Sequence, residues 1–208
     1  MGRMKPALYV FEGPNGVGKT TLSSNLNLYL NQQGFPSQLV ALPGKSAGTV
    51  GEHIYRLYHD PASFGVRYIS VTTEQLLFTA AHADVIENEI LPILSKGTNV
   101  VLDRYWWSTW VYSIVGGLDE RVRDLLLELE LKVWRDVKPH RIFLLHRNRP
   151  ATSEHNLEKW DRLVSLYDDI RSKQAALARI VDVDNNTDIQ SAMTNIIGSV
   201  ENGLDGDE

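Results

Sequence analysis

The chain has 208 residues, 43% hydrophobic and 23% charged, a composition that fits one globular domain with a sizeable core. The net charge of −5 argues against a large basic surface for nucleic acid, and the absence of cysteine excludes disulfides, thiolate metal sites and thiol catalysis. No apolar stretch reaches the roughly 18 residues of a membrane span, and no signal-peptide core follows residues 1–6. The sequence therefore predicts a soluble, cytoplasmic protein with no membrane partner.

Short apolar segments alternate with longer helical patterns along the chain. In order, they predict a strand at 7–12, a helix at 20–32, a strand at 37–42, helices at 50–58 and 73–95, a strand at 99–103, helices up to 115 and at 119–137, a strand at 141–145, a helix at 157–178, a strand at 180–184 and a helix at 188–200. Pro92 predicts a kink near the end of the long helical segment. Because the strands are too far apart in sequence for hairpins, they predict a five-stranded parallel sheet with helices on both faces, a three-layer α/β fold. Ligands are expected at the carboxyl ends of the strands.

Residues 13–20 match the phosphate-binding pattern G-x-x-x-x-G-K-[ST], and they lie between a predicted strand and a predicted helix. Glycines in such a loop let backbone N–H groups curve around phosphates, and the helix N-terminus adds positive potential. We expect Lys19 to bridge the β- and γ-phosphates of a nucleoside triphosphate and Thr20 to offer its hydroxyl to Mg²⁺. The loop therefore predicts a P-loop kinase or NTPase. The residues expected to bind ATP here are Gly13, Pro14, Asn15, Gly16, Val17, Gly18, Lys19, Thr20 and Thr21.

Four stretches of the chain resemble the thymidylate kinase family of nucleoside monophosphate kinases. They are residues 11–21, which contain the loop, and residues 74–82, 100–108 and 180–186. The stretches stand in the order that the family has, and the resemblance covers most of residues 7–200. It implies a single P-loop kinase domain over residues 1–208, with ATP as the donor and a small nucleotide-like acceptor, for which dTMP is the first expectation. A homodimer is implied as well.

The resemblance also assigns roles to several side chains near the strand ends. Arg104 should hold the phosphate of the acceptor, which a guanidinium can grip with two hydrogen bonds. Phe78 should lie against the acceptor base, Tyr112 near its sugar, and Asn185 near the donor base. Asp103 ends an apolar strand beside the loop, where it is expected to bind Mg²⁺ or its waters.

Several positions depart from the acceptor site of the family. His82 stands where the family usually has an Arg that reads an oxygen of the pyrimidine, and Thr109 stands where an amide often meets the base. Lys45 follows a Pro-Gly pair that lacks the family's Arg, and Asn15 replaces an acidic residue that contacts the sugar. His82 and Lys45 either contact the acceptor or lie exposed to solvent. The full set of expected acceptor contacts is Glu12, Asn15, Lys45, Phe78, His82, Arg104, Ser108, Thr109 and Tyr112.

A short lid is expected at residues 147–156, after the fourth strand. Its Arg147 and Arg149 either stabilise the transferring phosphoryl group or are ordinary surface charges. Residues 203–208 are expected to form a disordered tail. The predicted catalytic groups are Lys19, Asp103, Arg104, Arg147 and Arg149, and the predicted metal ligands are Thr20 and Asp103.

The sequence leaves two other functions open. The acceptor could offer a hydroxyl, on a nucleoside or a hydroxymethylated pyrimidine, free or in DNA. Trp106, Trp107 and Trp110 would favour this if they wall a wider pocket, although indoles more commonly pack in a core or a dimer interface. Against it, residues 41–51 contain no carboxylate that could act as a base. The other candidates for a base are Glu12, Glu52, Glu74 and Asp103. A nucleotide-dependent switch or binding module is the second alternative, although no N-K-x-D motif is present.

Overall fold

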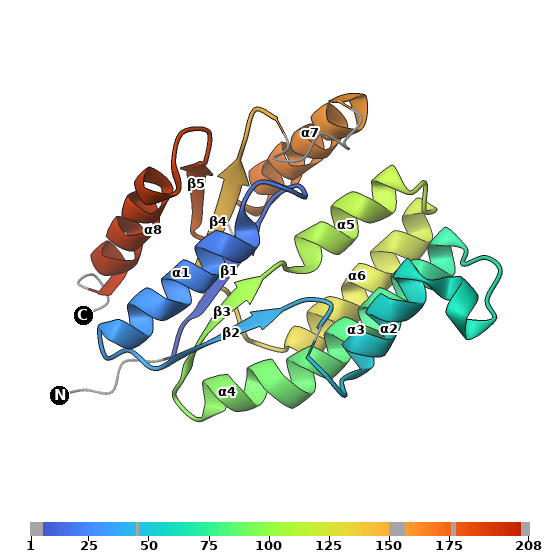
Figure 1. The fold of residues 1–208 in the computed structure, drawn as a ribbon, viewed down its shortest axis with the longest axis horizontal. Coiled ribbons are helices and arrows are strands. Elements are labelled where there is room, and N and C mark those ends of the chain that lie inside the picture. Colours follow the sequence, from blue (N-terminus) through green and yellow to red (C-terminus); the bar gives the residue numbers. More distant parts are fainter. Residues whose placement is uncertain (1–5, 45, 150–156, 176–177, 205–208) are drawn as a thin grey trace.

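The structure is a computed structural model that describes residues 6–44, 46–149, 157–175 and 178–204. Its centre is one sheet of five parallel strands in the order β2-β3-β1-β4-β5 (Figure 1). Each strand begins and ends within one residue of its predicted range, so the predicted parallel sheet is confirmed. The strands are β1 (Leu8–Glu12), β2 (Ser37–Ala41), β3 (Asn99–Asp103), β4 (Arg141–His146) and β5 (Ile180–Asp184).

Helices cover both faces of the sheet, which confirms the predicted three-layer fold (Figure 1). The helices are α1 (Lys19–Gln32), α2 (Val50–His59), α3 (Val71–Val85), α4 (Leu91–Ser95), α5 (Trp106–Val115), α6 (Glu120–Trp134), α7 (Leu157–Gln174) and α8 (Ile189–Leu204), with a 3₁₀ helix at Pro61–Phe64. Side chains alternate across a strand, so Val10 lies in the core cluster that contains Trp107, whereas the next residue, Phe11, lies with Leu22 of α1. Helices α1 and α8 thus share one face, and α3, α5 and α6 pack on the other.

The long helical segment predicted at 73–95 is divided by a π-helical turn at Ile86–Ile90. In this turn the N–H of Leu91 donates to the carbonyl of Ile86, five residues earlier. Pro92 has no N–H and lies in the first turn of α4, where none is needed. The regular α-helical hydrogen bonding is therefore interrupted at the π-helical turn, before Pro92, and not at the proline itself.

Helix α6 is confirmed, but two of its apolar residues that are four positions apart, Leu125 and Leu129, do not form its buried face. Leu125 and Leu129 are 66% and 51% exposed. The buried residues of α6 are Leu126, Glu130 and Trp134, which lie one position further along. A carboxylate therefore occupies a position on the buried stripe, which requires a partner for its charge.

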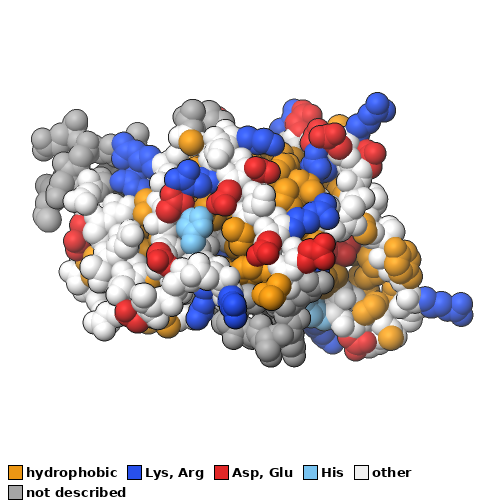
Figure 2. Space-filling model, turned by 90° about the horizontal axis from the view of Figure 1, so that it is seen from above, with side chains coloured by type: hydrophobic (Ala, Val, Ile, Leu, Met, Phe, Trp, Pro, Cys, Tyr) orange, Lys and Arg blue, Asp and Glu red, His pale blue; other side chains and the backbone are white. Residues whose placement is uncertain are grey.

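Among the helices of the described ranges, none is both long and apolar enough to cross a membrane. Figure 2 shows one face of the molecule, on which Lys and Arg side chains are interspersed with Asp and Glu. Helix α8 continues to Leu204, two residues into the predicted tail, and residues 150–156 of the predicted lid and 205–208 lie outside the described residues.

The packing of α2 against the turn after β2 yields a test of the fold. A Cβ atom at Gly51 would lie 2.2 Å from the carbonyl oxygen of Pro43 and 2.6 Å from that of Gly44. Since backbone atoms cannot give way cheaply, we expect Gly51→Ala to lower the free energy of unfolding by about 2 kcal/mol, measured by urea denaturation.

Gly198 in α8 is the matched control, because a Cβ atom there meets nothing within 4 Å. Gly198→Ala should raise the free energy of unfolding by about 0.5–1 kcal/mol, since alanine is the better helix former. Equal stabilities of the two variants would contradict the close packing at Gly51.

Candidate active site

The loop between β1 and α1 is held in its curve by specific backbone contacts. Lys19 Nζ donates to the carbonyl oxygens of Gly13 and Pro14, at 2.7 Å each. Gly13 and Gly18 have φ angles of 135° and 100°, in the region that favours glycine. A Cβ atom at Gly18 would lie 2.4 Å from Asn185 Nδ2, so a larger residue there would have to displace this side chain. The predicted phosphate-binding loop is thus formed as expected.

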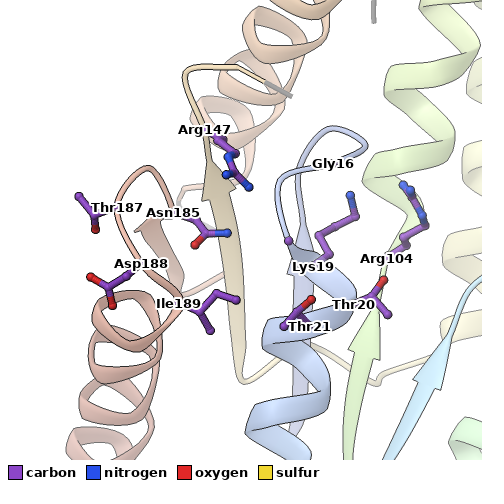
Figure 3. A pocket seen from close by; sticks show the side chains of 11 residues that line it. Gly16, Lys19, Thr20, Thr21, Arg104, Arg147, Asn185, Thr187, Asp188 and Ile189 are labelled. Atoms are coloured by element: carbon purple, nitrogen blue, oxygen red, sulfur yellow. The ribbon is translucent and has the colours of Figure 1, made fainter. Parts of the chain in front are cut away.

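A cavity of about 620 Å³ opens beside this loop, and we call it the P-loop cavity. Figure 3 shows that its side chains come from the loop, from the ends of β3 and β4, and from the segment after β5. This arrangement agrees with the expectation that ligands bind at the carboxyl ends of parallel strands. The predicted residues that line it are Gly16, Gly18, Lys19, Thr20, Thr21, Arg104, Arg147 and Asn185. The sequence did not single out Thr187, Asp188 and Ile189, although their place directly after β5 could have indicated them.

A second cavity, of about 450 Å³, lies between the loop and the helices α2, α3 and α5, and we call it the α3–α5 cavity. It gathers most of the predicted acceptor contacts, which are Asn15, Phe78, His82, Arg104, Ser108, Thr109 and Tyr112. Glu74, considered in the sequence only as a base, also lines it. The residues that sequence reasoning missed are Leu42, Pro43, Tyr55, Tyr58, His59 and Gln75, which come from the turn after β2 and from α2 and α3.

Arg104 lines both cavities. Its Nη1 donates to Ser108 Oγ at 3.0 Å, and its Nη2 donates to Asn15 Oδ1. Its backbone φ is 76°, an uncommon value for a residue with a side chain. Backbone strain of this kind is concentrated at functional sites. At Arg104 the chain leaves the sheet after β3, and the guanidinium lies between Ser108 of α5 and Asn15 of the loop.

Glu12 lines neither cavity, contrary to the predicted acceptor contact. It is fully buried at the end of β1, and its carboxylate accepts the backbone N–H groups of Tyr105 and Ser108 at 2.7 and 3.0 Å. Burial raises the pKa of Glu12, although the charges of Lys19 and Arg104 oppose this. The physical reason for the difference is that the N-terminus of α5 faces the end of β1 and takes up the carboxylate. Glu12 therefore holds the N-terminus of α5, whose Ser108 lines the α3–α5 cavity, without reaching the cavity itself.

Comparison with known proteins agrees with this geometry. A family model described as thymidylate kinase matches residues 11–190. A thymidylate kinase of Bifidobacterium longum (strain NCC 2705) is 35% identical over 164 residues, which cover 78% of this chain and 77% of the relative. The chain belongs to the thymidylate kinase family. Its members are ATP-dependent nucleoside monophosphate kinases, and membership favours neither a hydroxyl acceptor nor a binding module.

Two further comparisons extend the likeness. A thymidylate kinase of Chlamydia muridarum (strain MoPn / Nigg) is 42% identical over 118 residues, covering 56% of this chain and 55% of the relative. The crystal structure of thymidylate kinase from Ehrlichia chaffeensis has a TM-score of 0.77 with 24% identity, covering 95% of this chain and all of that chain. This likeness supports the P-loop kinase fold.

The position where the family usually has an Arg holds a buried histidine. His82 is 4% exposed and lines the α3–α5 cavity, so it does not lie on the exposed side of α3. Its Nδ1 lies 2.8 Å from Glu130 Oε1, and Glu130 of α6 is 2% exposed. Sequence reasoning missed Glu130, whose only local signal is its spacing of four from the apolar Leu126 and Trp134.

The remaining predicted residues lie in several places. Arg149 is exposed and lines neither cavity, and Lys45 lies outside the described residues. Trp107 of α5 is fully buried in the core between this helix and the sheet, so it does not widen the α3–α5 cavity. Trp106 and Trp110 also do not line that cavity. Val17 is buried beneath the loop, where its carbonyl accepts from Asn185 Nδ2 at 2.7 Å.

The predicted metal ligands Thr20 and Asp103 are brought together. Thr20 Oγ1 donates to Asp103 Oδ2 at 2.6 Å, whereas Asp103 Oδ1 is buried without a hydrogen-bond partner among the described residues. Within the same residues, no group of three or more His, Cys, Asp and Glu side chains is placed to hold a metal ion. A single carboxylate and a hydroxyl suit Mg²⁺, because this ion usually keeps several waters and binds phosphate oxygens.

The lysine of the loop gives a pH-dependent prediction. Burial lowers the pKa of Lys19 to about 7, and the charge of Arg104 adds to this, whereas Asp103 and Glu12 oppose it. A bound triphosphate favours the charged ammonium. Above pH 7 the lysine is mostly neutral before binding, so ATP binding should take up a proton. As the pH increases above 7, the Kd for ATP should therefore rise by up to about tenfold per pH unit.

Calorimetric titration with ATP at about pH 8, in buffers of different ionisation enthalpy, measures this proton uptake directly. Lys19→Met is the control, since it removes the titrating group and should abolish the uptake. The same heat of binding in every buffer for the unsubstituted protein would show that Lys19 is already charged.

Proposed function

We propose that this protein transfers the γ-phosphoryl group of ATP to dTMP, with ATP in the P-loop cavity and dTMP in the α3–α5 cavity. One observation carries the proposal, which is that a single guanidinium, that of Arg104, belongs to both cavities. Two nucleotides bound in these cavities would bring their phosphate ends to the same positive group. Proximity of this kind accounts for much of the catalysis of phosphoryl transfer.

The side chains divide the work by position. The phosphate oxygen of the acceptor is already anionic, so it needs no strong general base. Arg104 binds and orients that phosphate, and Lys19 stabilises charge on the β- and γ-phosphates. Arg147, which lines the P-loop cavity at the end of β4, is placed to stabilise the transferring group. Phe78 and Tyr112 line the part of the α3–α5 cavity that would hold the base and the sugar.

Thr20 and Asp103 would hold Mg²⁺ beside the phosphates of ATP. The unpartnered Asp103 Oδ1 supports this assignment, since a buried carboxylate oxygen with no donor suits a cation. When bound, the ion would neutralise charge on the β- and γ-phosphate oxygens. The hydroxyl of Thr20 keeps Asp103 oriented toward the loop.

We also infer a homodimer, formed through the exposed apolar residues of α6. Leu125 and Leu129 of this helix are exposed, and α6 packs beside α3 and α5. Sedimentation at micromolar concentration tests it, and Leu125→Lys with Leu129→Lys should yield the monomer. A cytoplasmic location remains a prediction from the sequence.

The proposed reaction is tested with a panel of acceptors. ATP and Mg²⁺ are supplied with dTMP, dUMP, dCMP or thymidine, and each product is identified by mass. We expect dTMP to become dTDP at the highest kcat/KM. A phosphate gained only by thymidine would show instead that the acceptor reacts through a hydroxyl.

Arg104→Lys tests the shared guanidinium. Lysine keeps the charge and has the same difficulty with a positive φ, but it loses the two-pronged grip on phosphate. We expect KM for dTMP to rise by about tenfold to a hundredfold, with a smaller change in the Kd for ATP. Arg135→Lys is the control, because Arg135 also has a positive φ, of 55°, and lines neither cavity. Unchanged kinetics for Arg104→Lys would remove Arg104 from the acceptor site.

A further inference from the structure

The hydroxyl of Tyr167 on α7 is buried beside the residue that ends β1. Tyr167 is 1% exposed, and its hydroxyl oxygen lies 3.0 Å from Ser108 Oγ and 3.3 Å from Glu12 Oε2. Burial and the charge of Glu12 raise the pKa of Tyr167 well above its ordinary value, so the hydroxyl stays protonated at neutral pH. Among the described residues of α7, none lines the P-loop cavity or the α3–α5 cavity. Tyr167 can therefore influence a ligand in these cavities only through its neighbours.

Ser108 Oγ is the atom that connects Tyr167 with Arg104. A serine hydroxyl has one proton and two acceptor lone pairs. The Arg104 guanidinium can only donate, so its Nη1 occupies one lone pair at 3.0 Å. A carboxylate can only accept, so the Ser108 proton goes to Glu12 Oε2 at 2.9 Å. The second lone pair accepts from the Tyr167 hydroxyl, and every hydrogen-bonding position of Ser108 Oγ is then used.

These contacts hold the Arg104 guanidinium on the side of α5. On the side of the loop, its Nη2 donates to Asn15 Oδ1 in an exposed contact, whereas the contact with Ser108 is partly buried. An arginine side chain has a large rotamer entropy, so its guanidinium binds phosphate more tightly when it is held in place before the ligand arrives. Without the Tyr167 hydroxyl, Ser108 would lose one of the contacts that fix its rotamer. The guanidinium would then have a less rigid acceptor.

We propose that Tyr167 is a positioning residue for Arg104, and that it acts through Ser108 to increase the affinity of the α3–α5 cavity for an acceptor that has a phosphate group. Its hydroxyl does not contact that acceptor. The inference rests on the proposed function, in which Arg104 binds the acceptor phosphate, and it adds to the acceptor site a helix that lines neither cavity. The effect is confined to phosphate binding, because the base and the sugar meet other residues of the cavity, among them Phe78 and Tyr112.

Tyr167→Phe tests the proposal, because it removes the hydroxyl and keeps the ring that packs in the core. The Kd values for dTMP and for thymidine are measured by calorimetric titration. We expect the Kd for dTMP to rise by about threefold to tenfold, as for the loss of one hydrogen bond, and the Kd for thymidine to stay unchanged because thymidine has no phosphate. A purely structural role would weaken both ligands equally. An equal loss for the two ligands, or no loss for either, would overturn the proposal.

Tyr29→Phe is the matched control. The Tyr29 hydroxyl also donates to a carboxylate, that of Glu201 on α8, and Tyr29 lines neither cavity. This variant should leave the ratio of the Kd for dTMP to the Kd for thymidine unchanged. A change in this ratio as large as that in Tyr167→Phe would overturn the proposal, since the effect would not depend on contact with Ser108.

The route through Ser108 is tested by combining Tyr167→Phe with Ser108→Ala. Ser108→Ala alone should raise the ratio at least as much as Tyr167→Phe, since it removes the acceptor of the Arg104 guanidinium. Adding Tyr167→Phe should then change the ratio by less than about twofold, because the side chain through which the hydroxyl acts is gone. Effects that multiply in the double variant would show that Tyr167 acts by another route, and the proposal would be wrong.

The same titrations separate this inference from the proposed reaction. If the unsubstituted protein phosphorylates dTMP and Tyr167→Phe leaves the ratio unchanged, the inference is wrong and the reaction stands. If no phosphoryl transfer occurs, but dTMP binds more tightly than thymidine and Tyr167→Phe reduces that difference, the reaction is wrong and the inference stands. Binding of thymidine as tightly as dTMP by the unsubstituted protein would overturn both.

Discussion

The arrangement of both cavities depends on one buried carboxylate. Glu12 ends the central strand and directly precedes the loop, and it accepts hydrogen bonds from Tyr105 and Ser108 at the start of α5. The hydroxyl of Tyr167 on α7 also donates to it, at 3.3 Å. One side chain thereby joins the first residue of the phosphate loop to two helices on the same side of the sheet. A carboxylate is suited to this place because a helix N-terminus offers unpaired N–H groups and a positive potential.

The position of Arg104 follows from this junction. Ser108, which donates to Glu12 through its backbone and its hydroxyl, also accepts from the Arg104 guanidinium. Asn15 holds the same guanidinium from the loop, and the N–H of Asn15 donates to the hydroxyl of Tyr112 on α5. The loop and α5 are therefore connected twice, once through the buried Glu12 and once at the cavity surface. Such connections fix a binding group before a ligand arrives, which lowers the entropy cost of binding.

The sequence was informative wherever local pattern alone decides the structure. The strands are short apolar runs between turn residues, and the loop needs glycine at fixed places, so both could be predicted from nearby residues. Long-range contacts could not be predicted in this way. The burial of Glu130 depends on His82, which lies 48 positions away on another helix. The role of Glu12 could not be predicted either, because its partners Tyr105 and Ser108 lie 93 and 96 positions further along the chain. Leu125 and Leu129 have the spacing of a buried helix face, yet both are exposed.

The sharing of Arg104 has a consequence for inhibitor chemistry. Two separate nucleotides each lose translational and rotational freedom when they bind, and their phosphate groups repel one another at the boundary between the cavities. A single compound with two nucleosides on one polyphosphate bridge would lose that freedom once, and the bridge would pass the guanidinium that both cavities share. A bridge too short to pass Arg104 would leave one of the two nucleosides outside its cavity.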